Sequence, residues 1–183
     1  MTDTSENNHW YVMRDLKRAN ALTPAYKQLA EAGFEVFTPM VTRIINSFGR
    51  RKKLSVPFMS DLLFVCSTRD KLDPLVRKIP TLQYRYVKGA VSQPMEVSVQ
   101  EMDRFRGAVE TASNPMFLSM DEIAPEMYGA NIRIISDGIL NNYEGRLLKI
   151  KGSGKKRIMV CLKESNLVAA IEITASDYVE VKV

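Results

Sequence analysis

The sequence predicts an α+β protein with two parts: a ferredoxin-like βαββαβ domain followed by a small, five-stranded, SH3-like β-barrel. Residues 9–110 alternate between strand-like and helix-like patterns. Residues 111–128 interrupt this alternation with prolines and polar side chains. Residues 129–183 then contain short β-branched runs separated by turns rich in Gly, Asn, Ser and Asp. With 183 residues, the chain is long enough to bury a core in each part.

The elements of the first part follow the order of a ferredoxin-like fold. Thr23 and Pro24 suit the start of a first helix, and Gly33 suits its end. A third helix is expected to begin at Ser98, because Glu101 completes a capping-box pattern with it. The elements expected in chain order are a strand at 10–13, a helix at 24–33, strands at 34–45 and 54–66, a helix at 70–79, a strand at 81–91 and the third helix.

Five strands are expected in the second part, where Val, Ile and Tyr recur; these residues pack better in strands than in helices. The runs are 132–135, 146–150, 157–162, 167–173 and 178–181. The whole chain is therefore expected to consist of a disordered tail (1–8), a first domain (9–110), a linker (111–128) and a barrel domain (129–183).

The net charge of +5 is mild, but its placement is uneven. Four consecutive basic residues follow Gly49 at an expected hairpin tip: Arg50, Arg51, Lys52 and Lys53. A second basic group, residues 149–157, brackets the turn Gly152-Ser153-Gly154. Each group is either a solvated loop or a contact for nucleic-acid phosphates, and neither is interleaved with the aromatic residues that base stacking uses.

The sequence argues against catalysis, a cofactor and a membrane span. His9 is the only histidine, so no histidine-based dyad or metal cluster is expected, and no phosphate-binding loop has the required strand-to-helix context. No apolar run reaches membrane-spanning length, and the polar start does not resemble a signal peptide, so a cytoplasmic monomer is expected. Cys66 and Cys161 are expected to be buried, reduced thiols, with a metal site or a disulfide as the alternatives.

Residues 129–145 resemble the KOW motif of the NusG family of transcription factors. An apolar-Arg-apolar strand, Ile132-Arg133-Ile134, leads through Asp137-Gly138 and Tyr143 to the motif glycine, Gly145. Ile139 and Leu140 replace the Pro-Phe that often follows Asp-Gly in the family. A side chain at Gly145 is expected to clash or to demand backbone strain.

The first part is similar to the NusG N-terminal domain. Trp10-Tyr11-Val12 matches its opening strand, and residues 57–65 (PFMSDLLFV) occupy the place of its Leu-Phe-Pro-Gly/Asn-Tyr-apolar-Phe-Val signature. Ser60-Asp61 stands where the family has Pro-Gly or Pro-Asn, and Leu62 stands where it has Tyr. The divergent signature and residues 102–105 (MDRF) favour a specialised paralogue of the type that acts on capsular polysaccharide operons.

The resemblance implies a transcription elongation or antitermination factor. Its first domain would bind the β′ clamp helices of RNA polymerase, bridge towards the β subunit and disfavour the open, paused state. By position, the residues expected to bind polymerase are Tyr11, Met59, Leu62, Phe64 and Tyr86.

The remaining partners follow from the same resemblance. The basic tip at 50–53 would contact upstream or non-template DNA, and Ile139 and Tyr143 would bind a small-subunit ribosomal protein or Rho. The alternative is an RNA-binding or ribosome-associated KOW module, which would bind RNA tightly without polymerase.

Overall fold

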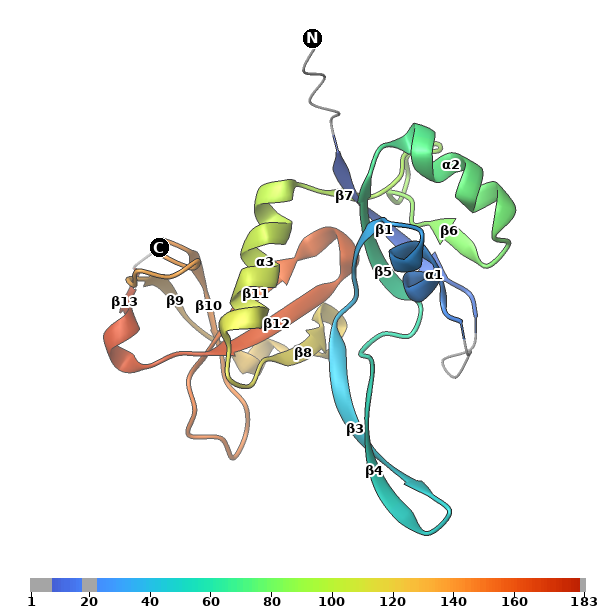
Figure 1. Cartoon of the computed structure of the whole chain (residues 1–183). Helices are drawn as coiled ribbons and strands as arrows, with labels where there is room; N and C mark the ends of the chain where they lie inside the picture. The colour runs from blue at the N-terminus through green and yellow to red at the C-terminus, as the bar shows by residue number, and fades with distance from the viewer. Residues whose placement is uncertain (1–7, 18–22, 182–183) are drawn as a thin grey trace. The chain divides into compact units, whose positions relative to one another are not determined.

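A computed structural model describes residues 8–17 and 23–181, which form two compact units divided between Ser98 and Val99 (Figure 1). The expected tail at 1–8 lies outside the described residues except for Asn8. The α+β class is confirmed, because each unit combines an antiparallel sheet with one or two α-helices.

The main sheet of the first unit has the strand order of a ferredoxin-like fold. The order of the four main strands is β2-β5-β1-β6, and every pairing is antiparallel. β1, the first strand in the chain, therefore lies in the middle of the sheet between β5 and β6. A short fifth strand, β7, also pairs with β1. The strands are β1 (His9–Asp15), β2 (Glu35–Phe37), β5 (Leu62–Ser67), β6 (Leu82–Tyr84) and β7 (Glu96–Val97).

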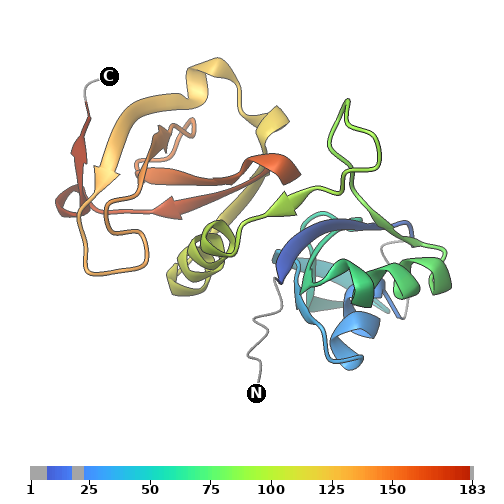
Figure 2. The same cartoon turned by 90° about the horizontal axis from the view of Figure 1, so that it is seen from above.

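Two helices, α1 (Ala25–Glu31) and α2 (Arg69–Lys78), lie on the same side of this sheet (Figure 2). Leu29 of α1 and Leu72 of α2 are fully buried in the core between helices and sheet. The sheet contributes alternate residues to this core, because successive side chains of a strand point to opposite faces. They are Tyr11, Met13, Leu63, Val65, Leu82 and Tyr84.

The start of α1 is held by a residue that the sequence pattern did not indicate. Pro24 occupies the N-cap position, and no side chain forms a local cap there. Instead, a carboxylate oxygen of Asp15, at the end of β1, accepts a hydrogen bond of 2.6 Å from the backbone N–H of Ala25. The other oxygen accepts from the N–H of Lys17 at 3.0 Å. Asp15 is buried, so this cap fastens the helix to the sheet.

We expect Asp15→Ala to lower the free energy of unfolding by about 1–3 kcal/mol, because it leaves a buried helical N–H without its acceptor. Asp15→Asn keeps one carbonyl oxygen that can accept a hydrogen bond, so it should lower the free energy of unfolding by less than Asp15→Ala. Urea denaturation of both variants checks the order, and equal stability of Asp15→Ala and the original chain would contradict the capping role.

The second unit is a six-stranded antiparallel sheet in the order β13-β9-β10-β11-β12-β8. The five expected runs are all strands, including 167–172, whose paired alanines would also tolerate a helix. The last of these strands pairs with the first, and among the described residues β13 and β8 stand at the two ends of the strand order. The five strands are β9 (Tyr128–Ile134), β10 (Glu144–Leu148), β11 (Arg157–Leu162), β12 (Leu167–Glu172) and β13 (Tyr178–Glu180).

The third helix was expected in the first domain, and residues 111–128 were expected to link the two domains. In the structure both segments belong to the second unit. A sixth strand, β8 (Met116–Ser119), pairs with β12, with Phe117 opposite Ala169. The helix, α3 (Val99–Thr111), packs against β11 and β12, and the Phe105 and Phe117 ring centroids are 6.5 Å apart. Four 3₁₀ turns complete the unit: η1 (Met120–Glu122), η2 (Pro125–Met127), η3 (Lys163–Ser165) and η4 (Ala175–Asp177).

Among the described residues, no helix is long and apolar enough to cross a membrane, and no group of His, Cys, Asp and Glu side chains could hold a metal ion. Cys66 on β5 and Cys161 on β11 form no disulfide among the described residues, and both are half-buried, whereas fully buried thiols were expected. Burial raises the pKa of the Cys161 thiol, which lowers its reactivity.

Candidate functional site

The five residues expected to bind polymerase do not form one pocket, because the sheet separates them. Tyr11 pairs with Val65, whereas Phe64 pairs with Val12, the next position along β1. Adjacent positions of a strand point to opposite faces, so Tyr11 and Phe64 lie on different sides of the sheet. Leu62 shares the face of Phe64.

Tyr11 lies in the core beneath the helices, and Tyr86 lies at its edge. The Tyr11 and Tyr84 ring centroids are 5.6 Å apart, and those of Tyr84 and Tyr86 are 6.3 Å apart. The Tyr84 hydroxyl donates to Asp73 of α2 at 2.8 Å, and burial together with this hydrogen bond raises the pKa of Tyr84. Tyr86 remains 48% exposed, so it is the accessible member of the group.

The face of the first-unit sheet that α1 and α2 do not cover is strongly apolar. We call it the second face: it carries Val12, Phe37, Leu62 and Phe64. The Phe37 and Phe64 rings contact each other, with centroids 5.9 Å apart. Leu62 and Phe64 are 2% and 0% exposed, so a charge placed at either position would disturb folding as well as binding.

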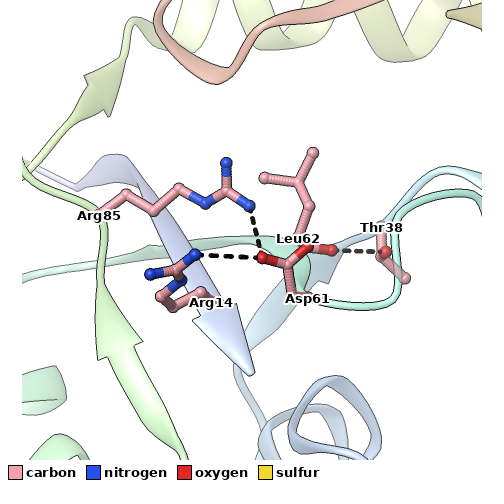
Figure 3. Close-up of polar contacts among 5 residues, drawn as sticks. All are labelled: Arg14, Thr38, Asp61, Leu62 and Arg85. Atoms are coloured by element: carbon pink, nitrogen blue, oxygen red, sulfur yellow. Dashed lines mark hydrogen bonds and ion pairs between the residues drawn. The ribbon is translucent and has the colours of Figure 1, made fainter. Parts of the chain in front are cut away.

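Met59 lies half-buried in the turn that leads into β5. Asp61, in the same turn, is held by polar contacts with two arginines (Figure 3). One Asp61 carboxylate oxygen lies 3.0 Å from an Arg85 nitrogen and 3.4 Å from an Arg14 nitrogen. The backbone carbonyl of Asp61 also accepts from the N–H of Asp15 at 3.1 Å. Asp61 therefore links the turn that contains Met59 to β1, and through Arg85 to the segment that directly follows β6. The sequence signals this role only in that Asp61 stands where the family signature has Gly or Asn.

Residues 50–53 lie in a strand and not in the turn where they were expected. They begin β4 (Arg50–Pro57), which pairs with β3 (Met40–Ser47) in a long β-hairpin that extends away from the first-unit sheet (Figure 1). Its two-residue loop is Phe48-Gly49, with φ angles of 49° and 74°. Positive φ at both positions is the type I′ geometry, whose twist matches the two strands. The four predicted cations, residues 50–53, and Arg43 on β3 are all exposed.

No acidic residue lies between Glu35 and Asp61, so the hairpin has no negative charge of its own. Within the part of the chain that the structure describes, none of the five hairpin cations forms an ion pair. Alternation along β4 places Lys52 and Lys53 on opposite faces of the hairpin. The hairpin is therefore cationic on both faces.

Three cations of the second basic group, residues 149–157, form contacts with other residues of the second unit. Lys155 pairs with Glu172 at 2.8 Å, and Lys156 donates to the Tyr178 hydroxyl at 2.6 Å. Arg157 is buried and donates to the Ser153 hydroxyl at 3.2 Å. These contacts favour a structural role for the second group and leave the hairpin as the stronger candidate for binding nucleic acid.

The two predicted partner residues of the second unit lie beside α3. The Arg104 guanidinium lies over the Tyr143 ring, 5.5 Å from its centroid, and the Tyr143 hydroxyl donates to the carbonyl of Met159. Ile139 lies so close to α3 that a Cβ added at Gly107 would come within 2.9 Å of it. Ile139 is 50% exposed, whereas Tyr143 is largely enclosed.

Gly145, the motif glycine, is required by a close approach and not by a positive φ. An added Cβ would lie 2.9 Å from the Tyr143 ring and 3.1 Å from the backbone oxygen of Met159 on β11. The expected clash is therefore with the neighbouring strand and the Tyr143 ring.

Comparisons with known proteins identify the family. The sequence profile described as "NusG: Transcription termination factor nusG" matches residues 8–106. No protein with a curated description matches the chain. A solved structure titled "Domain interaction in Thermotoga maritima NusG" is similar, with 15% sequence identity and a TM-score of 0.46 over 96% of this chain and 98% of that chain. Because the profile spans more than half of the 183 residues, the chain belongs to the NusG family of transcription factors.

Proposed function

We propose that this protein is a transcription elongation or antitermination factor that binds RNA polymerase through its first unit and recruits a second partner through its KOW unit. Membership of the NusG family carries this proposal. The factor acts by binding and not by catalysis, and the specialised, capsular-operon type is the paralogue that its divergent signature favours.

The second face and the Met59 turn are the proposed contact with the polymerase clamp. A half-buried methionine backed by buried aromatic and aliphatic side chains suits an apolar helical partner, because large apolar residues supply most of the energy of such interfaces. Met59 is the proposed direct contact, because it is half-buried and reaches the surface. Leu62 and Phe64, which are 2% and 0% exposed, are proposed to support this contact from within the second face. Tyr11 packs in the core on the opposite face of the sheet and supports it from there. Tyr86, at the edge of that core, is proposed to add an exposed aromatic ring to the polymerase contact.

Binding of this kind is sufficient to suppress pausing. If the factor binds the closed clamp more tightly than the open one, it shifts the population away from the paused state. A preference of about 1.4 kcal/mol would change the ratio of the two states tenfold.

The KOW unit is the proposed site for a small-subunit ribosomal protein or Rho, with Ile139 as the accessible residue. Because Tyr143 is held against Arg104 and Met159, its proposed contribution is to shape the loop that presents Ile139.

A binding assay with purified core RNA polymerase tests the proposal against the RNA-binding alternative. The factor is expected to co-elute with polymerase and to bind free RNA only weakly. Tight binding to free RNA without retention by polymerase would instead favour a ribosome-associated KOW module.

The basic hairpin is the proposed nucleic-acid contact of the elongation complex. Replacing all four residues of 50–53 with alanine should weaken binding to an elongation complex and flatten its salt dependence. The slope of log K against log salt should fall by up to about 3, because each lost contact with a single strand removes about 0.7. Titrations over a series of salt concentrations measure this slope, and an unchanged slope would identify the hairpin as a solvated loop.

A further inference from the structure

The tip of the hairpin presents an aromatic side chain that is fully exposed. Phe48 has a relative exposure of 104% and stands at the first position of the type I′ turn. No aromatic residue is interleaved with the basic run, but the turn places Phe48 next to it, with Ser47 paired opposite Arg50.

Phe48 is costly at this position and contributes nothing to the core. Its φ of 49° lies in the left-handed region, where a bulky side chain is uncommon and where Asn or Gly would fit the turn better. A phenylalanine that is both strained and fully exposed is not explained by the folding of the hairpin. Local strain of this kind is characteristic of functional sites.

The surroundings of Phe48 indicate a polyanionic ligand. Arg43 and the four cations at 50–53 lie on the same hairpin, and no acidic residue occurs between Glu35 and Asp61. Cations that follow a phosphate backbone, combined with an aromatic ring on which bases stack, are the two components of single-strand binding sites. A duplex offers no free base face unless a base step is first unstacked, which costs a few kcal/mol.

We infer that Phe48 stacks on an unpaired base of single-stranded nucleic acid while the cations of the same hairpin contact the adjacent phosphates. This inference rests on the nucleic-acid contact proposed above and adds to it the ligand class and the stacking residue. It does not depend on the assignment of the polymerase-binding face.

Fluorescence anisotropy of the full-length protein with a labelled oligothymidine, an oligouridine of equal length and a DNA duplex tests the inference. Phe48→Ala should weaken binding to the single strands roughly 5- to 140-fold, the range measured for loss of one base–aromatic stack. Phe48→Trp should retain binding, and its added indole should be quenched by the bound strand. The tighter of the two single strands identifies the source as DNA or transcript.

Ile44 supplies a matched control, because it is an exposed apolar residue of the same hairpin, at 66%. Ile44→Ala should bind both single strands as the original chain does. If the four-alanine variant of 50–53 loses binding while Phe48→Ala does not, the stacking inference is wrong and the phosphate contact stands. If neither variant changes binding, both proposals are wrong. Equal losses on duplex and single strands would also overturn the single-strand assignment.

Discussion

Met59→Glu should lower the affinity of the full-length protein for core RNA polymerase roughly 30-fold, because a central apolar interface residue contributes about 2 kcal/mol. The turn that carries Met59 is held by the Asp61 contacts with Arg14 and Arg85, so the side chain is presented in a fixed position. Since Met59 is half-exposed, the new carboxylate remains solvated in the free protein and the fold should persist. Isothermal titration calorimetry with core polymerase measures the loss.

Two controls separate binding from folding and from charge. Met59→Leu keeps an apolar side chain of similar volume and should bind nearly as well. Ala30→Glu adds the same charge at an exposed position of α1, on the covered side of the sheet, and should bind like the original chain. If Met59→Glu and Ala30→Glu bind polymerase equally well, the Met59 turn is not part of the interface.

Gly145→Val should destabilise the second unit by about 1–3 kcal/mol, because overpacking a close-packed site forces side chains and backbone to shift. The Tyr143 ring can move, but the Met159 oxygen belongs to β11 and cannot move without disturbing the β10–β11 pairing. Native-state hydrogen exchange should show the loss in amides of residues 99–183 and little change in the first unit.

Gly154→Val provides the comparison for this result. No atom lies within 4 Å of a Cβ added at Gly154, and its φ is not in the left-handed region, so the substitution should change stability by less than about 0.5 kcal/mol. Equal protection factors in the Gly145 and Gly154 variants would show that the close approach at Gly145 is not required.

Much of the fold could be predicted because its elements have strong local signals. Gly33, which has a φ of 86°, ends α1 as expected, and the recurring Val and Ile residues of 129–183 form the five expected strands. The ferredoxin-like order of the first sheet also agrees with the order of elements read along the chain. Local periodicity and turn chemistry are sufficient for this level of description.

The parts that were missed depend on contacts between residues distant in sequence. The four-residue strand β8 follows Pro115 and is too short to show periodicity; its pairing with β12, about fifty positions later, defines it as a strand. Similarly, Asp15 caps a helix that begins ten positions later, where local patterns indicate Thr23. Tertiary pairing determined the outcome in both cases.

The candidate site shows the same limit. Motif positions alone placed Tyr11 and Phe64 in one group, but the period of two along β1 and β5 assigns them to opposite faces. Phe48 was overlooked because it precedes the basic run, and only the hairpin register places it at an exposed tip. The sequence identifies which residue types form an interface more readily than it identifies the direction in which their side chains point.

Co-elution of separate fragments with core RNA polymerase tests the central claim most directly. The division between Ser98 and Val99 provides the boundary, with residues 1–98 in one fragment and 99–183 in the other. The first fragment is expected to co-elute with polymerase, Met59→Glu to weaken its binding by the same roughly 30-fold factor, and the second fragment to elute alone. Retention of the 99–183 fragment without the first would contradict the central claim.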